Sequence, residues 1–286
     1  MLVYVHKQHD KNIAMNSLFD IEGRVAVMTG ACGVLGSSIV NYFSSQGCKL
    51  VLLDLEQSRN KGECLVNTIR DAGGEAVFFP TDVLQKDMLG RNLADILDRF
   101  GRIDILLNAA GGNMNAANVP PDKTIFDLDI EAIRKVSELN LFGTIIPTMV
   151  FAREMVRTGK ASIINFCSES ALRPLTRVAG YGVAKAAVAN WTKWLSAELA
   201  IKFGEGVRVN AIAPGFLLTN QNRSLLVNED GSLTDRSHTI ISHTPIGRFL
   251  EPEELLGTLH YLASDASRAV TGTIAVVDGG FDAFSI

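Results

Sequence analysis

The sequence lacks the features that mark disulfide-rich, zinc-binding or membrane-spanning proteins. Its 286 residues include four cysteines, which form neither a C-x-x-C pair nor a zinc-binding spacing. Most of them lie in apolar stretches, so we expect buried free thiols in a reducing cytoplasm and no metal site. No apolar run approaches the ~18–20 residues that span a bilayer, and the N-terminus lacks the order of a signal peptide. These absences predict a cytoplasmic protein with no membrane partner.

Charge of one sign is also missing. The chain has 27 basic and 31 acidic residues, a net charge of −4, so no nucleic-acid or membrane-surface partner is indicated. There is no repeat, low-complexity tract or Pro/Ser-rich linker, which favours one domain over the two that the length allows. We interpret residues 1–19 as an N-terminal extension, in which Met15 is an alternative start, and residues 20–286 as a single domain.

Short β-rich runs alternate with helical patterns along most of the chain. Several of the runs are apolar nearly throughout, which is typical of parallel strands covered on both faces. The alternation predicts an α/β fold, a Rossmann-like doubly wound parallel sheet of about seven strands. The expected strands are Arg24–Thr29, Lys49–Asp54, Glu75–Phe79, Ile103–Asn108, Ser162–Cys167, Val207–Ile212 and Thr273–Asp278. The expected helices are Leu35–Gln46, Gln57–Ala72, Lys86–Phe100, a long region over Ile125–Thr158, Tyr181–Phe203 and Glu251–Ala263.

A glycine-rich turn follows the first expected strand. Gly30, Gly33 and Gly36 are spaced three apart in T-G-A-C-G-V-L-G, and Val34 and Leu35 open the next helix. Glycines at a strand-to-helix turn let the backbone approach a ligand closely, and a helix N-terminus attracts a pyrophosphate. The spacing is not the commoner G-x-G-x-x-G, and a tight turn without a ligand remains the alternative.

The second expected strand ends on an acidic residue. Asp54 lies 24 residues after Gly30, where a carboxylate accepts hydrogen bonds from the adenosine ribose of a dinucleotide. The same carboxylate repels a 2′-phosphate, and neither Cys32 nor Leu55 offers a cation to attract one. We therefore expect NAD as the cofactor, with NADP less favoured.

A candidate acid/base group lies between Ser168 and Lys185. If the residues after Gly180 are helical, Tyr181 and Lys185 project from one face, four residues apart. An adjacent ammonium favours the phenolate, so we expect the pKa of Tyr181 to fall from roughly 10 towards neutrality. Such a group suits carbinol–carbonyl interconversion, with Ser168 hydrogen-bonded to the substrate oxygen. A Y-x-x-x-K pair alone also occurs by chance.

Taken together, these motifs resemble the short-chain dehydrogenase/reductase family over about residues 20–286. The resemblance implies catalytic roles for Ser168, Tyr181, Lys185 and Asn140, the last in a proton-relay water site. The glycine turn departs from the family pattern T-G-x-x-x-G-x-G at Gly33 and Val34. By resemblance, further cofactor contacts are expected from Leu55, Asp82, Val83, Asn108, Ala109, Ala110, Gly111, Pro214, Gly215 and Thr219, besides Tyr181 and Lys185 themselves.

A narrower resemblance is to the D-mannonate oxidoreductase (fructuronate reductase) branch of the family. It is carried by segments such as N-A-A-G-G-N, R-P-L-T-R-V and V-D-G-G-F-D-A-F-S. It implies interconversion of D-mannonate and D-fructuronate with NAD(H). Two alternatives remain open: another sugar-acid or polyol dehydrogenase, such as one like gluconate 5-dehydrogenase, and a non-catalytic nucleotide-binding Rossmann protein.

Polar residues near the expected cleft suit an acidic, hydroxylated substrate. Arginine binds carboxylates through two parallel hydrogen bonds, and amides bind hydroxyls. The alternative for each arginine is solvation or pairing with an acid of the insertion at residues 216–250, which we interpret as a helical lid. The candidate substrate residues are Asn113, Arg173, Arg177, Asn222 and Arg223. Resemblance further implies a homo-oligomer, a dimer or tetramer, built through the long helices.

Overall fold

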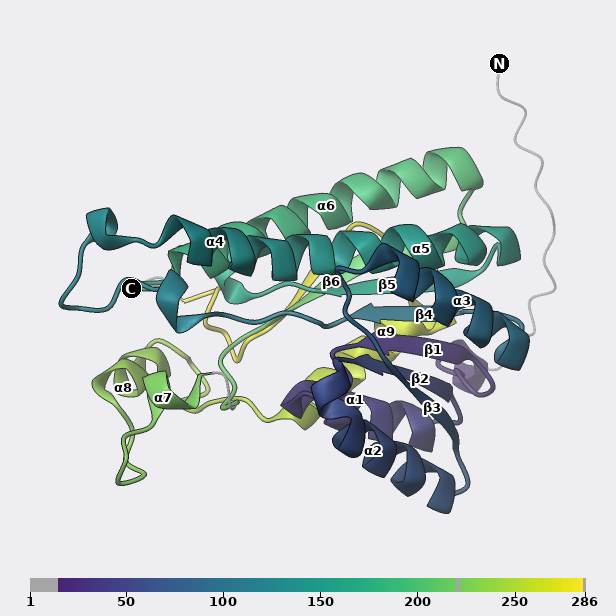
Figure 1. Cartoon of the computed structure of the whole chain (residues 1–286), viewed down its shortest axis with the longest axis horizontal. Helices are drawn as coiled ribbons and strands as arrows, with labels where there is room; N and C mark the ends of the chain where they lie inside the picture. Colours follow the sequence, from purple (N-terminus) through teal and green to yellow (C-terminus); the bar gives the residue numbers. More distant parts are fainter. Residues whose placement is uncertain (1–14, 220–221, 285–286) are drawn as a thin grey trace.

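The protein is built around one parallel β-sheet. A computed structural model describes residues 15–219 and 222–284. Its seven strands lie in the order β3-β2-β1-β4-β5-β6-β7, and all neighbouring strands are parallel (Figure 1). The predicted doubly wound sheet is therefore confirmed. The strands are β1 Val25–Thr29, β2 Lys49–Asp54, β3 Glu75–Pro80, β4 Ile105–Asn108, β5 Ala161–Phe166, β6 Val207–Pro214 and β7 Ile274–Val277.

Helices cover both faces of the sheet, which explains the continuous apolar strands. Every residue of β1, β4 and β5 is buried. One face packs against α1 (Val34–Ser45), α2 (Arg59–Asp71) and α9 (Leu256–Ala263), and the other against α3 (Lys86–Phe100), α5 (Gly143–Thr158) and α6 (Ala179–Phe203) (Figure 1). Strand order reverses between β1 and β4, and ligand clefts in such sheets lie beyond the carboxyl ends of the strands there.

The long helical region predicted over Ile125–Thr158 is interrupted. It contains a 3₁₀ turn at Ile125–Asp127, helix α4 at Ile130–Ser137 and a π-helical turn at Glu138–Phe142 before α5 begins. The buried Asn140 side chain in the π turn donates to the Val136 carbonyl at 2.8 Å. A side-chain amide that bonds the backbone in this way competes with the regular helical hydrogen bonds. The predicted helix Glu251–Ala263 likewise begins as a 3₁₀ turn, Pro252–Leu255.

The segment between β6 and α9 carries two short helices. They are α7 (Arg223–Leu226) and α8 (Asp235–Ser242), which lie together at one end of the molecule in Figure 1. Thr234 caps α8 by accepting from the Ser237 amide. A bridge from Leu217 to Leu250 brings the two ends of the segment together. The insertion predicted at residues 216–250 therefore holds helices, and it stands beyond the carboxyl ends of the strands.

The cysteine prediction holds for three positions and fails for one. Cys32, Cys48 and Cys167 are buried free thiols, whereas Cys64 is exposed on the polar face of α2. No helix in the described ranges combines the length and apolar character needed to cross a membrane.

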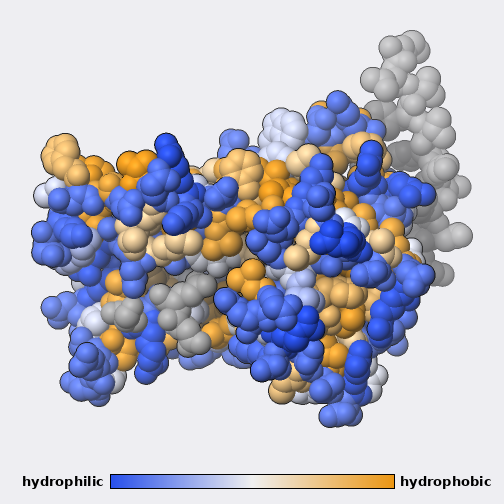
Figure 2. Space-filling view, viewed as in Figure 1, coloured by the Kyte–Doolittle hydropathy of each residue, from blue (hydrophilic) through white to orange (hydrophobic). Residues whose placement is uncertain are grey.

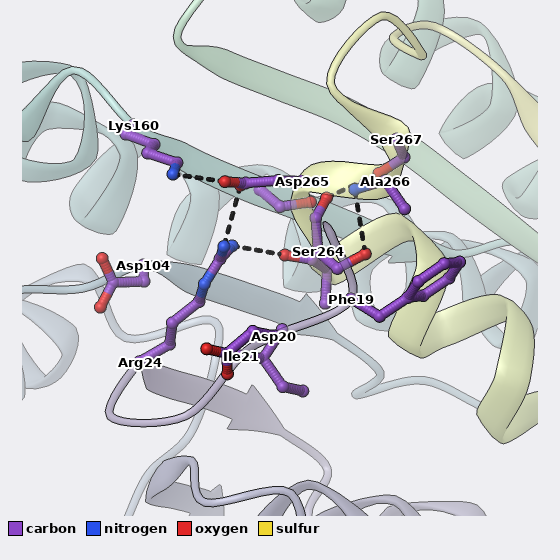
Figure 3. Close-up of polar contacts among 12 residues, drawn as sticks. Phe19, Asp20, Ile21, Arg24, Asp104, Lys160, Ser264, Asp265, Ala266 and Ser267 are labelled. Carbon is purple, nitrogen blue, oxygen red and sulfur yellow. Dashed lines mark hydrogen bonds and ion pairs between the residues drawn. The ribbon is translucent and has the colours of Figure 1, made fainter. Parts of the chain in front are cut away.

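A partly buried ion pair ties the amino end of the sheet to the end of α9 (Figure 3). Arg24, just before β1, donates to the Ala263 carbonyl at 2.9 Å and to Asp265 at 2.8 Å. Lys160, just before β5, donates to the other Asp265 oxygen at 2.6 Å. Burial alone raises the pKa of Asp265, but the hydrogen bonds from Lys160 and Arg24 outweigh it, so the pKa lies below its ordinary value.

These two cations give a matched test of what burial contributes. The Arg24 side chain is 18% exposed and that of Lys160 is 61% exposed, although both contact Asp265. We expect Arg24→Met to lower the free energy of unfolding by about 2 kcal/mol, because the Ala263 carbonyl loses this donor and Asp265 keeps only the exposed Lys160. Lys160→Met should cost less than about 1 kcal/mol, as exposed pairs do. Urea unfolding measures both, and equal losses would contradict this account.

Candidate active site

A cavity of about 590 Å³ lies beyond the carboxyl ends of the central strands. It runs from the glycine turn after β1 to the segment that carries α7 and α8. Among the predicted site residues, it is lined by Gly30, Gly33, Val34, Leu35, Gly36, Asp54, Leu55, Asp82, Val83, Ala109, Ala110, Gly111, Asn113, Ser168, Tyr181, Lys185, Pro214, Gly215, Thr219 and Asn222. Residues at or after the carboxyl ends of β1 to β6 are thus brought to one space with residues of α6, as the sequence predicts.

The glycine turn leaves no room for a side chain at Gly30 or at Gly36. Gly30 has φ of 66°, and a Cβ there would lie 2.9 Å from the Ala109 carbonyl oxygen. A Cβ on Gly36 would lie 2.6 Å from the Ala31 carbonyl oxygen. Gly33 sits at the N-cap of α1 without any side chain over the helix end. The amino end of α1 is therefore open to the cavity, where its amides attract an anion.

Asp54 is oriented by the same turn. Its two carboxylate oxygens accept from the Cys32 amide and the Leu55 amide, each at 2.8 Å. Each oxygen keeps a further lone pair for a hydroxyl group. Ser58 and Lys61 also line this end of the cavity, and the sequence reasoning missed both. Lys61 is a cation at the same end of the cavity as Asp54. The sequence prediction against NADP rested on the lack of a cation that could attract a 2′-phosphate, and Lys61 was not included in it.

Asn108 is the one predicted cofactor residue that does not reach the cavity. Its amide donates to Thr148 at 2.8 Å and to Asn165 at 2.9 Å, so it ties β4 to α5 and β5. The next residues, Ala109 and Ala110, do line the cavity, and their amides donate to Thr29 Oγ1 at 3.1 and 3.0 Å. Asn108 therefore supports the loop that follows it.

Ser168, Tyr181 and Lys185 meet in the middle of the cavity. The predicted helix over Tyr181 is α6, and it places Lys185 Nζ 5.6 Å from the centroid of the Tyr181 ring. Lys185 is buried and donates to the Phe166 carbonyl at 2.7 Å. Ser168 Oγ accepts from the amide and the hydroxyl of Ser170, at 3.2 and 3.1 Å. These two bonds occupy the acceptor positions of Ser168, so its own proton can be donated to Tyr181 or to a bound ligand.

The pKa of Tyr181 does not fall as the sequence reasoning expected. Burial raises it to about 12, and a hydrogen bond with Ser168 acts in the opposite direction. Burial also lowers the pKa of Lys185 to about 8, because a desolvated ammonium is disfavoured. The ammonium is directed at the Phe166 carbonyl, so proximity to a lysine alone does not produce a phenolate here.

Asn140 lies behind the cavity. Its side chain donates to the Gly112 carbonyl at 2.7 Å and accepts from the Gly112 amide at 3.1 Å. Gly111 has to be small, because a Cβ there would lie 2.6 Å from Asn140 Oδ1 and 3.3 Å from Lys185 Nζ. Asn140 therefore holds the loop after β4 against the lysine. A role in a water relay stays a prediction.

None of the three predicted arginines lines the main cavity, and Arg177 lines only a smaller side cavity. Arg173 pairs with Asp282 at 2.7 Å and donates to the Phe284 carbonyl at 3.1 Å, so the predicted carboxylate contact is replaced by an internal pair. Arg223 is exposed at the start of α7. Asn113 and Asn222 do line the cavity, but their amides are partly engaged with Asn118 and Leu217.

The arginine that lines the cavity is Arg236, at the start of α8, which sequence reasoning missed. Its guanidinium donates to the side chain and carbonyl of Thr176, at 2.8 and 3.1 Å. Within residues 15–219 and 222–284, no carboxylate pairs with it. Burial, and then repulsion from Arg177, lower its pKa. Arg177 shares a side cavity of about 330 Å³ with it.

Glu169 is a second residue that sequence reasoning missed. It follows Ser168 directly and lines the cavity, yet its side chain is 1% exposed. Burial, together with the negative charges of Asp278 and Asp282, raises its pKa to about 8 against the effect of Arg173. The available signal was its position beside Ser168 in S-E-S, which places an acidic residue next to a predicted catalytic group.

Comparisons with known proteins agree with this geometry. A sequence model of the family described as enoyl-(acyl carrier protein) reductase matches residues 30–282. The chain belongs to the short-chain dehydrogenase/reductase family. It is 42% identical over 276 residues to UxuB, an uncharacterized oxidoreductase of Bacillus subtilis (strain 168), covering 93% of this chain and 97% of that one. From its family and its similarity to this oxidoreductase, the chain is an oxidoreductase.

Two solved structures are similar throughout. One, from Haemophilus influenza, is provisionally named a D-mannonate oxidoreductase and has NAD bound; it superposes with a TM-score of 0.86 at 39% identity, covering 93% of this chain and 97% of that chain. The other is a gluconate 5-dehydrogenase from Burkholderia cenocepacia J2315 in complex with NADP and tartrate, with a TM-score of 0.83 at 29% identity and coverage of 94% and 99%. Relatives of this fold thus hold either nicotinamide dinucleotide.

Asp54 and Lys61 provide a matched test of cofactor choice. We expect Asp54→Asn to weaken NADH binding by roughly 10-fold, the scale of a charge-assisted hydrogen bond, and to weaken NADPH binding less. Lys61→Met should leave the Kd for NADH nearly unchanged and weaken NADPH binding. Titration calorimetry with both dinucleotides measures the four constants. An unchanged NADH-to-NADPH ratio in Asp54→Asn would show that Asp54 does not select the cofactor.

Proposed function

We propose that this oxidoreductase transfers a hydride between NAD(H) and a sugar acid, in the interconversion of D-mannonate and D-fructuronate. The observation that carries the proposal is Arg236, a half-buried cation without an acidic partner in the described chain, in the cavity that contains Ser168, Tyr181 and Lys185. An unneutralised arginine in a cavity favours an anionic substrate. The resemblance to the D-mannonate oxidoreductase branch and the similar structure with NAD point to the same substrate class.

The cavity fits a nicotinamide dinucleotide on its own residues. The Gly30 backbone has no space for a Cβ, the amino end of α1 is open, and Asp54 faces the same end. The pyrophosphate would lie on the turn from Gly30 to Gly36, and Asp54 would accept from the adenosine ribose hydroxyls. Asp82 and Val83 would border the adenine. Pro214, Gly215 and Thr219 would border the nicotinamide, beside Tyr181 and Lys185.

Tyr181 and the residues around it would carry out the proton transfer of the reaction. Bound NADH supplies the hydride to the ketone carbon. Tyr181 would give its phenolic proton to the ketone oxygen as that oxygen gains charge, and Ser168 would donate a hydrogen bond to the same oxygen. Lys185 has N–H groups besides the one bonded to Phe166, and these would bind the nicotinamide ribose and stabilise the phenolate. Asn140 would hold the loop beside Lys185.

The substrate carboxylate would bind at Arg236. This side chain comes from the α7–α8 segment, and Leu225 and Leu226 of α7 also line the cavity. The segment would therefore act as a lid that brings the charge-recognising group to the substrate. Arg177 would add a second positive charge from the side cavity, and Asn113 and Asn222 would contact hydroxyl groups.

A second candidate is another sugar-acid dehydrogenase. The similar gluconate 5-dehydrogenase structure is a complex with NADP and tartrate, a small hydroxylated acid. The same arginine and the same acid/base group would serve that reaction. A non-catalytic nucleotide-binding role would leave Tyr181 and Lys185 without a function, and it predicts NADH binding with no turnover of any ketone or alcohol.

We also propose that the protein forms a homo-oligomer through α4, α5 and α6. Large apolar side chains are exposed on these helices, including Met149 at 59%, Trp194 at 54% and Ile201 at 80%. Figure 2 shows apolar side chains gathered over this layer. Exposed apolar surface of this kind marks an interaction site, and the family resemblance favours a second copy of this chain as the partner.

The substrate proposal is tested by a panel of compounds followed by the absorbance of NADH. The panel contains hexuronates, aldonates and neutral ketoses and polyols. We expect D-fructuronate reduction and D-mannonate oxidation to have the highest kcat/KM. Preference for a neutral polyol would remove the sugar-acid assignment, and preference for gluconate would favour the second candidate.

The acid/base assignment predicts the effect of removing one oxygen. Tyr181→Phe should lower kcat by at least ~10²-fold, the usual effect of a positioned acid/base group. The Kd for NADH should stay near that of the wild type, which provides the control for folding. Near-normal turnover of a folded variant would show that Tyr181 is not the proton donor.

Arg236 and Arg173 form a matched pair for carboxylate recognition. Arg236→Met should raise KM for the sugar acid by roughly 10- to 100-fold, because a charge-assisted hydrogen bond is lost, and should leave KM for a neutral ketose nearly unchanged. Arg173 is already paired with Asp282, so Arg173→Met should change both KM values alike. The assignment fails if Arg236→Met also affects acid and ketose equally.

A further inference from the structure

Glu169 is a residue of the cavity wall whose carboxyl group is buried without a partner. Its side chain is 1% exposed, and neither of its oxygens has a hydrogen-bond partner. Within the described chain, no other ionisable side chain is left buried in this way. An unmet polar group of this kind costs about 1–3 kcal/mol, so it calls for a functional explanation.

The groups around Glu169 favour the neutral carboxylic acid. Asp278 follows β7, and its two oxygens accept from the Gly280 amide at 2.7 Å and the Asp282 amide at 2.5 Å. Asp282 itself pairs with Arg173, at the end of the turn that begins with Glu169. From α6, which packs against this turn, Tyr181 and Lys185 line the same cavity. Arg173, whose positive charge lowers the pKa of Glu169, is thus already paired with Asp282.

A protonated carboxyl group both donates and accepts a hydrogen bond. Because the pKa of Glu169 is about 8, the group keeps its proton at neutral pH. Its natural partner is an uncharged group that can also donate and accept, namely a hydroxyl. A substrate carboxylate in this position would be repelled by the negative charges of Asp278 and Asp282, whereas at Arg236 it would be attracted by a positive charge.

We propose that Glu169 is a specificity-determining residue whose carboxylic acid turns into the cavity when substrate binds and hydrogen-bonds a substrate hydroxyl group, next to the oxygen held by Ser168. This inference rests on the proposed function for the presence of a hydroxylated substrate. A site with a buried polar group rejects an analogue that lacks the matching hydroxyl, because the group is then left unpaired. Glu169 thus selects polyhydroxylated chains, while Arg236 selects the acid.

The test compares an apolar and an isosteric variant, each assayed with the panel compound that the wild type uses best and with its monodeoxy analogues. Glu169→Met should raise KM for the full substrate by about 10-fold, the scale of a hydrogen bond lost from a buried group. For one deoxy analogue it should change KM little, because that analogue lacks the partner hydroxyl. Glu205→Gln, on an exposed residue before β6, is the control and should change nothing.

Glu169→Gln keeps a donor and an acceptor but cannot ionise. In the wild type, KM should rise as the pH passes about 8, where the carboxyl loses its proton and its donor. In Glu169→Gln, KM should no longer show this rise. Lys185 also titrates near pH 8, but its effect is common to both proteins, so the difference between them isolates Glu169.

Each outcome decides the inference. Equal effects of Glu169→Met on all the analogues, a changed Kd for NADH in place of a changed KM, or a wild-type KM that shows no rise above that pKa would each overturn it. If the wild type prefers a neutral polyol and Glu169→Met still discriminates against the full substrate, the sugar-acid proposal fails and Glu169 stands. If the wild type uses a sugar acid and Glu169→Met shows no such discrimination, the sugar-acid proposal stands and the inference about Glu169 fails. No turnover of any polyhydroxylated compound overturns both.

Discussion

The hydrogen bond from Lys185 to the Phe166 carbonyl fixes the geometry on which the site depends. At 2.7 Å it joins α6 to the carboxyl end of β5, two residues before Ser168. One contact therefore sets the position of the lysine, of Tyr181 one turn earlier on the same helix, and of the loop that carries Ser168 and Glu169. Asn140 and the small Gly111 let the loop after β4 approach the same ammonium.

Desolvation dominates the electrostatics of this region. It raises the pKa values of Tyr181 and Glu169 and lowers that of Lys185, so each group tends towards its neutral form. A neutral tyrosine suits the proposed role as proton donor in ketone reduction. A neutral glutamic acid suits hydroxyl recognition. Arg236, by contrast, stays charged although it is partly buried. The charged part of the cavity is the part proposed to bind the carboxylate, and the part with neutral groups is the one proposed to carry the chemistry.

Much of the fold and of the cofactor end of the cavity could be predicted from the sequence. Parallel strands covered on both faces leave continuous apolar runs, and Gly30, Asp54 and Tyr181 lie at or near the ends of strands or helices, at informative spacings. The break at Asn140 could not be predicted, because it depends on a side chain that bonds the backbone of its own helix and the distant Gly112.

The substrate end was predicted less well, for a physical reason. Arg173 has the right residue type in the right loop, but Asp282 approaches it from the far end of the chain. Arg236 lies in the insertion and reaches the cavity only because α8 packs beside Thr176. Tertiary contacts between distant segments decide which arginine is paired with an acid. These contacts cannot be read from the order of residues in the sequence. The raised pKa of Tyr181 depends on burial in the same way.

The central claim is that a hydride passes from the dinucleotide to the ketone carbon of a sugar acid in this cavity. The most direct measurement uses NADH that carries deuterium on the transferred position, with D-fructuronate as substrate and mass spectrometry of the product. The account predicts D-mannonate with one deuterium on the former ketone carbon, and loss of this product in Tyr181→Phe. Oxidised cofactor without a deuterated sugar acid, or no product from a folded enzyme that binds NADH, would contradict it.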